Sequence, residues 1–496
     1  MVRSRAQLLP EFTAELEEIR TNGITPDLLY KIIEKHQPNA LFNKDLYERY
    51  MTIKEGVPIF RRTPRYQEDN PINNQVNNDY FGQIVNAKVG CCAGNPFAYS
   101  YSVTDESEED TGGSEAVEIA SRTLTDFVKR NTMHKVDAQT TKNAAIYGYS
   151  GKLAYIDKEL NERVKAIHGY ETIALSDTSI AEPEYAIRYY QTLNLEGTAV
   201  WTVEFYDDKF ITTYKGDLQA LEFIESIPHG FDYCPLQGIA NNEECMGDAE
   251  KVLALIDDYD KKVSDNSNEL ESFVHALMLT SILGEDVEET LKHATQSGIL
   301  NIPPVGQQTS GTPVQYVTKN INDAFTEHHL ERLESNIYMF SQTPDFNDES
   351  FGSASGVSLE HKFNGMKEKC TVFKANIQEA AMYMNKVICS SWRKKGINID
   401  PIHINVDIEF NIPQDIETEA RVVQTLLSAG LPKRYAFARL SDVDDVEWLM
   451  DLLKAEKEEA MEVESLYAPT TDQNQDEEEE EKKPDETDEE EEEQDS

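Results

Sequence analysis

The sequence predicts an α+β protein. Strand-like segments between 152 and 214 predict antiparallel strands, whereas sustained apolar stripes between 247 and 395 predict long helices. Hydrophobic residues make up 39% of the 496 residues, which is enough for a sizeable core. A fully disordered chain is therefore excluded.

The first half combines both kinds of element. Residues 1–46 predict helices, one of which spans 27–35 behind Thr25-Pro26, because proline suits the first helical position. Residues 47–101 predict short strands and turns, 102–113 a loop, and 116–129 an amphipathic helix. An antiparallel meander is then expected from three strand-like segments: 185–190, 199–205 and 209–214.

The second half is mostly helical. Residues 247–279 carry an apolar stripe without an internal proline, which predicts one helix of about 50 Å. Further helices are expected at 323–340 and 357–395, and the intervening segments are an insert at 290–320 and a polar stretch at 341–356. Because a long helix is stabilised mainly by packing of its apolar face, this pattern also indicates an oligomer.

The C-terminal part predicts strand character at 402–412 and then two helices, 416–428 and 442–466, separated by Gly430 and Pro432. Residues 471–496 hold 16 acidic and 2 basic side chains and no core-forming residues, so a disordered acidic tail is expected.

The charge balance restricts the possible partners. The chain has 92 acidic and 46 basic residues, a formal net charge of −46, and the part before the tail still carries −32. Such a body repels phosphate, which excludes non-specific surface binding of nucleic acid. The longest mostly apolar stretch, 274–283, is too short to span a membrane, and no secretory signal is expected.

The sequence shows no convincing catalytic, cofactor or metal motif. Residues 147–152 resemble a phosphate loop, but Ile146 stands where its first glycine belongs, so a tight turn before a strand is expected. Residues 352–356 lack the central serine of a nucleophile elbow. His328 and His329 diverge on a helix and are expected to be exposed, and the six cysteines are expected to be reduced and mostly buried.

Several segments, in their order and spacing, resemble the portal (head-to-tail connector) proteins of long-tailed bacteriophages. They are the asparagine-rich run 74–80 followed by 84–90 and 93–96, the stretch 235–270, the stretch 338–359 with Pro344-Asp345 and Ser355-Gly356, and the helix start at 442–447. Cys91-Cys92 departs from the aromatic residue often found there in the family.

The resemblance implies a portal fold of wing, stem, clip and crown that assembles as a ring, usually dodecameric, around an axial channel. By position, the parts are the wing at 1–246 and 357–414, stem helices at 247–275 and 321–340, the clip at 276–320, a tunnel loop at 341–356, the crown at 415–466 and an acidic tail at 467–496.

The implied function is non-enzymatic: a channel at one capsid vertex for DNA packaging and ejection. The expected partners are further copies of the chain, the terminase large subunit, a head-completion adaptor, the major capsid and scaffolding proteins, and double-stranded DNA, with no membrane. The expected location is the virion, and the host cytoplasm during assembly. The alternatives are an acidic helical scaffold or adaptor without a channel, and an enzyme with a dispersed site.

The resemblance places the functional residues in the polar stretch. The tunnel-loop residues would be Ser341, Asp345, Phe346, Asn347, Phe351, Ser353, Ser355 and Gly356. A loop that flexes against moving DNA should be polar and rich in glycine and serine, as this one is. An acidic channel prevents tight binding, so a few basic residues would make local DNA contacts, and Lys319 and Arg332 are the candidates.

Overall fold

The two compact units of the computed structural model are Met1–Pro413 and Gln414–Ser496. The described residues are 11–63, 72–103, 111–175, 182–195, 197–274, 278–280, 299–301, 315–316, 323–346, 356–412, 416–437, 439–440, 446, 449–450 and 452–456. Helices occur in both units, and the described strands lie in the first. This mixture confirms the α+β class.

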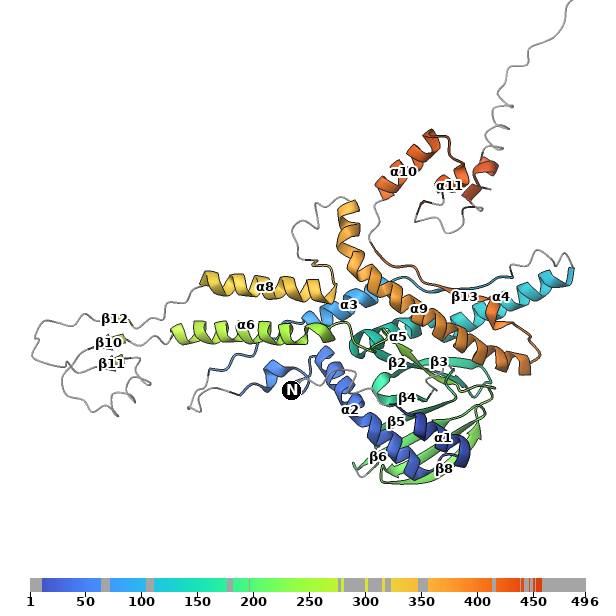
Figure 1. Ribbon diagram of the computed structural model, residues 1–496, viewed down its shortest axis with the longest axis horizontal. Coiled ribbons are helices and arrows are strands. Elements are labelled where there is room, and N and C mark those ends of the chain that lie inside the picture. The colour runs from blue at the N-terminus through green and yellow to red at the C-terminus, as the bar shows by residue number, and fades with distance from the viewer. Residues whose placement is uncertain are drawn as a thin grey trace, which may run out of the picture. The chain divides into compact units, whose positions relative to one another are not determined.

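Two N-terminal helices, α1 (Thr13–Asn22) and α2 (Pro26–Tyr50), pack against an antiparallel sheet with the order β4-β5-β6-β7-β8 (Figure 1). Its strands are β4 (Thr172–Leu175), β5 (Tyr185–Leu193), β6 (Ala199–Tyr206), β7 (Phe210–Asp217) and β8 (Ala220–Pro228). Strands β5, β6 and β7 pair consecutively, which confirms the predicted meander.

Helix α2 begins as the sequence predicts but ends much later. The Thr25 hydroxyl accepts a hydrogen bond from the Leu28 amide, and Pro26 occupies the first turn. The expected end near residue 35 is wrong, because the helix continues through Pro38 to Tyr50. Burial of residues on both sides of this proline, including Ile33 and Leu46, outweighs the lost backbone hydrogen bond.

A second sheet, with the order β3-β2-β9, lies against the other face of the meander. Its strands are β2 (Tyr149–Ile156), β3 (Glu162–His168) and β9 (Leu236–Ala240), and α5 (Met133–Tyr147) precedes them. Gly148, with φ of 80°, ends α5 immediately before β2, and Lys152 is buried within β2, 2.8 Å from the Asp137 carboxylate. The segment 147–152 is therefore a turn before a strand, as predicted, and not a phosphate loop.

The prediction of short strands for 47–101 is wrong in its centre, where α3 (Tyr80–Ala93) forms. Gly82, Gly90 and β-branched residues lower the helix propensity of this segment. The Asp79 side chain nevertheless caps the helix by accepting from the Gly82 amide, and most of the helix is buried. Strand β1 (Ala98–Tyr101) follows, and η2 (Pro58–Arg61) precedes.

The predicted helices at 116–129, 323–340 and 357–395 are confirmed as α4 (Thr111–Asn131), α8 (Asp323–Ser341) and α9 (Gly356–Lys394). The predicted helix over 247–279 is too long. It consists of η4 (Glu250–Val252) and α6 (Leu253–Val274), and residues 278–280 form a strand. At ~1.5 Å per residue, the 22 residues of α6 span about 33 Å.

Helices α6 and α8 lie side by side, and α9 packs against α3 and β9 (Figure 1). Between α6 and α8, the described strands β10 (Met278–Thr280), β11 (Ile299–Asn301) and β12 (Gln315–Tyr316) form a small sheet. After α9, η6 (Pro401–His403) and β13 (Ile404–Asp407) follow, and β13 pairs with β1, in agreement with the strand character predicted at 402–412.

In the second unit, α10 (Ile416–Ser428) confirms the helix predicted at 416–428, and a short α11 (Lys433–Phe437) follows Gly430, whose φ is 77°. Residues 452–456 are helical, whereas most of the helix predicted at 442–466 and the acidic tail lie outside the described residues.

Candidate functional site at the junction of α3, α6, α8 and α9

The inner face of α6 changes from apolar to polar along the helix. The buried row begins with Val252, the last residue of η4, and continues along α6 with Ile256 and then Asp260 and Ser264. The apolar stripe predicted over 247–279 is thus correct only near its start, and Leu270, an apolar residue within that range, is 66% exposed. A buried polar face needs hydrogen-bond partners, which here come from an extended segment.

Residues 72–79, which we call the asparagine strap, run antiparallel to α6. The backbone amides of Asn78, Val76 and Asn74 donate to side chains of α6: to Asp260 at 2.8 Å, Ser264 at 2.9 Å and Asn268 at 2.6 Å. Two residues of extended chain advance about 6.6 Å, and four residues of helix about 6 Å. This match explains why every second strap amide meets every fourth helix side chain.

Aromatic side chains join the end of the strap to α6 and α8. Tyr80 is the first residue of α3. The centre of its ring lies 5.0 Å from that of Tyr259 in α6 and 5.8 Å from that of Tyr338 in α8, and both contacts are edge to face. The Tyr338 hydroxyl donates to Gln83 Oε1 of α3 at 3.0 Å. Burial and the nearby carboxylate of Asp345 raise the pKa of Tyr338 to about 12, so this hydroxyl remains protonated and can donate.

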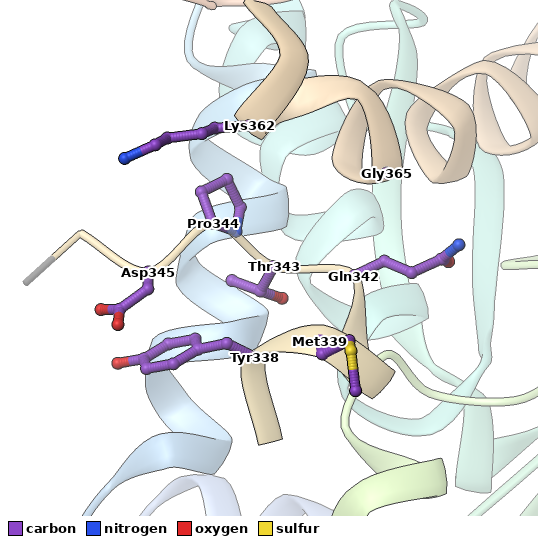
Figure 2. A pocket seen from close by; sticks show the side chains of 8 residues that line it. All are labelled: Tyr338, Met339, Gln342, Thr343, Pro344, Asp345, Lys362 and Gly365. Atoms are coloured by element: carbon purple, nitrogen blue, oxygen red, sulfur yellow. The ribbon is translucent and has the colours of Figure 1, made fainter. Parts of the chain in front are cut away.

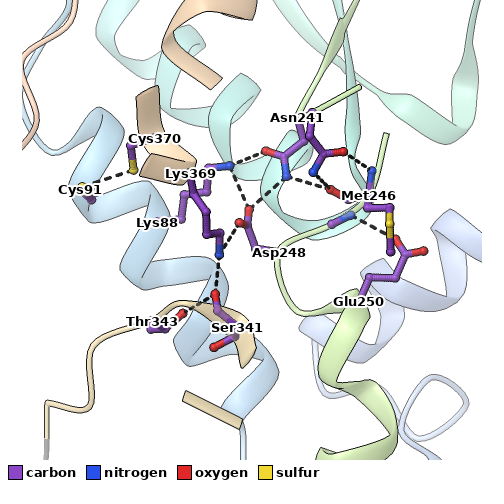
Figure 3. A network of polar contacts seen from close by, with 12 residues as sticks. Lys88, Cys91, Asn241, Met246, Asp248, Glu250, Ser341, Thr343, Lys369 and Cys370 are labelled. Carbon is purple, nitrogen blue, oxygen red and sulfur yellow. Dashed lines mark hydrogen bonds and ion pairs between the residues drawn. The ribbon is translucent and has the colours of Figure 1, made fainter. Parts of the chain in front are cut away.

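A buried ionic network lies behind these rings (Figure 3). Asp248, just before η4, places one carboxylate oxygen 3.1 Å from Lys88 Nζ of α3 and the other 2.6 Å from Lys369 Nζ of α9. Lys88 also donates to Asn241 Oδ1 at 2.6 Å, and Lys369 donates to the Ser341 carbonyl at 2.8 Å. One carboxylate thus connects α3, α9, the segment leading into α6 and the end of α8.

The electrostatics of this network favour the ionised carboxylate. Burial alone would raise the pKa of Asp248, but the charges and hydrogen bonds of Lys369 and Lys88 together hold it below its ordinary value. Both side chains of the Lys88–Asp248 pair are 1% exposed, so water screens them little. The Lys88 ammonium also lies 4.7 Å from the centre of the Phe373 ring.

The segment after α8 packs against α9 around a cavity of about 280 Å³ (Figure 2). Ser341 and Thr343 are buried, and Gln342 has a φ of 54°. Gly365 of α9 allows this close approach, because a Cβ atom there would lie 3.2 Å from Gln342 Cβ. Figure 2 shows Tyr338, Asp345 and Lys362 projecting to one side and Gln342 to the other.

The structure describes some of the predicted tunnel-loop residues. Ser341 is the buried last residue of α8 and Gly356 the first of α9, while Asp345 is half-buried and the Phe346 ring lies 6.2 Å from Phe363. Five predicted site residues lie outside the described residues: Lys319, Asn347, Phe351, Ser353 and Ser355. Arg332 is exposed on α8.

The ionic network was not predicted from the sequence. Lys88 and Asp248 lie in the segments 84–90 and 235–270 that carry the family resemblance, but nothing in those segments indicates that their side chains meet each other or Lys369. In the sequence, the burial of these charged side chains is indicated only by apolar neighbours such as Val85, Ala249 and Met366.

Metal and membrane sites are not found in the described part of the chain. No cluster of histidine, cysteine and acidic side chains there fits a metal ion, and no helix there combines the length and apolarity needed to cross a bilayer. His328 is exposed on α8, as predicted, whereas His329 is half-exposed beside Asp258 at 3.5 Å. The six cysteines are free thiols, five of them buried, as predicted.

Replacing Ser264 by alanine should destabilise the fold by about 1–2 kcal/mol, because the Val76 amide loses its acceptor in a partly buried place. Ser267→Ala is the matched control on the same helix, since its hydroxyl bonds only to the Val263 carbonyl one turn earlier. Denaturant unfolding measures both variants. Equal stabilities would contradict the role assigned to the strap.

Lys88→Met should lower the free energy of unfolding by roughly 3–5 kcal/mol, because it leaves a buried carboxylate with one cation. The control Lys251→Met, at an exposed site nearby, should lower it by less than about 0.5 kcal/mol.

Because the pKa of Asp248 is depressed, its contribution to stability is present above the unfolded-state pKa of about 3.9 and is lost as the pH falls through the folded-state value. Unfolding measured from pH 7 down to about pH 2 should show this loss below about pH 4 in the wild type and not in Asp248→Asn.

Comparisons with known proteins agree with the resemblance seen in the sequence. The model of the family described as "Phage portal protein, SPP1 Gp6-like" matches residues 29–463. A curated relative, the portal protein of Clostridium phage phiCD119, is 22% identical over 358 residues, which cover 69% of this chain and 76% of the relative. The matched region includes the strap, the ionic network and the paired helices. The chain therefore belongs to the SPP1 Gp6-like family of phage portal proteins and has the role of a phage portal protein.

Proposed function

We propose that copies of this chain assemble into a ring whose axial channel admits double-stranded DNA during packaging and ejection. The portal family is structural and non-enzymatic. One observation carries the proposal: the paired helices α6 and α8 pack against each other and still expose large apolar side chains.

Exposed large apolar side chains lie near the end of α6 and at both ends of α8. Leu270 of α6 is 66% exposed, and Phe325, Met339 and Phe340 of α8 are 71%, 59% and 54% exposed. The opposite side of α8 is buried through Leu330, Leu333 and Ile337. Two helices with apolar residues on inner and outer sides are suited to packing against neighbouring copies, because exposed apolar surface of this kind favours association.

We assign the parts of the chain by position. The wing comprises residues 1–246 and 357–414, the stem 247–275 and 321–340, the clip 276–320 and the crown 415–466. The tunnel loop spans 341–356 at the junction of stem and wing, where Lys369 and the cavity-lining residues hold its first residues. A fixed base with a polar loop above it allows the loop to move without loosening the ring.

Charge supports the passage of DNA. An acidic channel wall repels the phosphate backbone and prevents a deep binding well, so DNA can slide. Lys319 and the exposed Arg332 are the candidate local contacts.

We further propose that the clip binds the terminase large subunit during packaging and a head-completion adaptor afterwards. The ring, usually a dodecamer in this family, would sit at one vertex of the virion, in contact with major capsid and scaffolding proteins. It would assemble in the host cytoplasm. Electron microscopy of the purified chain tests the proposal: rings with an axial opening support it, whereas particles without an opening favour an acidic scaffold or adaptor.

Leu270→Asp and Phe340→Asp should each reduce ring formation by roughly tenfold or more, because each places a charge in a buried contact between copies. Leu193→Asp is the matched control, since Leu193 is 74% exposed in the meander, away from both helices. Native mass spectrometry measures the fraction in rings, and circular dichroism checks that the monomer stays folded. Wild-type ring yields from both stem variants would contradict the proposed contact.

Removing six residues from 347–355 should leave rings intact and strongly reduce DNA packaging, because the loop then no longer reaches the passing duplex. Removing five residues of the acidic run 477–481 serves as the control deletion. Negative-stain images report assembly, and nuclease-protected DNA in a packaging reaction reports function. Loss of rings would show that the loop is structural instead.

A further inference from the structure

Three thiols gather where α3 packs against α9. Cys91 and Cys92 lie near the end of α3, and Cys370 lies in α9; their side chains are 4%, 1% and 0% exposed. The Cys370 thiol donates to the Cys91 sulfur at 3.3 Å, although the two residues are 279 positions apart in the sequence (Figure 3). Nothing in the portal role requires this contact.

The surroundings of the pair favour a thiolate at Cys91. Hydrogen bonds from Cys370 and Cys92 lower the pKa of Cys91, burial opposes this, and the ammonium groups of Lys88 and Lys369 add to the lowering. The bond to Cys91 and burial raise the pKa of Cys370. The pair therefore joins a thiolate to a thiol that donates to it, as in a thiol pair prepared for oxidation.

The other buried cysteines differ in this respect. Burial raises the pKa of Cys234 and of Cys389, in each case to about 12, so both remain protonated thiols. Cys234 donates to backbone carbonyls of Tyr206 and Leu236. These two residues serve as internal controls for any thiol-specific reaction.

We propose that Cys91 and Cys370 are an oxidation site at which a hydroperoxide forms a disulfide that joins α3 to α9. A disulfide needs sulfurs about 2 Å apart, so the two side chains must approach each other by little more than 1 Å. The proposal depends on the packing of α3 against α9 and is independent of the DNA channel.

The reaction balances with hydrogen peroxide as the oxidant. The Cys91 thiolate attacks one peroxide oxygen, the O–O bond breaks, and a sulfenic acid and hydroxide form. Cys370 gives its proton to this hydroxide, and its sulfur attacks the Cys91 sulfur and displaces a second hydroxide. This hydroxide takes up the proton that the Cys91 thiol released when it formed the thiolate. Overall, two thiols and one peroxide give one disulfide and two water molecules.

The disulfide would fix the junction covalently. Lys88 precedes Cys91 by one turn of α3, and Lys369 directly precedes Cys370, so the bond would form beside both lysines that hold Asp248. Because it closes a loop of more than 250 residues, the bond should restrict the unfolded chain strongly and raise the melting temperature by about 5 °C.

The test uses the full-length protein, reduced, desalted and treated with hydrogen peroxide. Free thiols are then alkylated in denaturant, and the peptides are identified by mass spectrometry. We expect a linked pair of peptides that contain Cys91 and Cys370, released by dithiothreitol, with Cys234 and Cys389 alkylated. Cys92→Ser should keep the link, and Cys91→Ser and Cys370→Ser should lose it.

Two results would overturn the proposal: full alkylation of Cys91 and Cys370 after peroxide treatment of the wild type, or a link through Cys92 in their place. Both are read from the wild type, so the test stands even where a variant fails to fold. The melting temperature of the oxidised protein gives a second readout. It should fall on addition of dithiothreitol in the wild type and in Cys92→Ser, and stay unchanged in Cys91→Ser and Cys370→Ser.

Discussion

The arrangement of the first unit depends on the carboxylate of Asp248 between two lysines. A buried charge is tolerated only when every partner is in place, and the partners of Asp248 come from α3 and α9, while one of those lysines also holds the carbonyl of Ser341. Three segments far apart in the sequence must therefore meet within hydrogen-bond distance. This requirement fixes where α6 begins, where α8 ends and where the polar segment between α8 and α9 starts.

The asparagine strap solves a related problem along α6. A helix with Asp260 and Ser264 on its buried side cannot be stabilised by apolar contacts there, and an extended segment has backbone amides that need acceptors. The strap amides are donors for the buried polar side chains of α6, and those side chains are acceptors for the strap amides. Because amides and side chains meet at matched intervals, the strap also sets the register of α6 against α3, which begins directly after the strap.

The sequence predicted those elements whose burial follows a simple period. The meander and α4, α8, α9 and α10 were predictable because their apolar residues repeat every second residue or every third to fourth. Helix α3 was missed because Gly82 and Gly90 weaken its propensity and tertiary burial compensates. The end of α6 was overestimated because Leu270 continues the apolar period although its side chain is exposed. The ionic junction could not be predicted, since no local pattern shows that Lys88 and Asp248 meet.

The division between polar and apolar contacts has a mechanical consequence. At the junction, α6 and α8 are held by directional contacts, the ionic network, the strap and the Tyr80 rings, which tolerate little displacement. Away from the junction, the exposed side chains Leu270 and Phe325 are apolar, and apolar contacts tolerate sliding because they lack direction. A ring built in this way would keep the base of each tunnel loop in place while neighbouring stems adjust against one another. In the proposed ring, rigidity at the junction and adaptability between copies would follow from the chemistry of these two sets of residues.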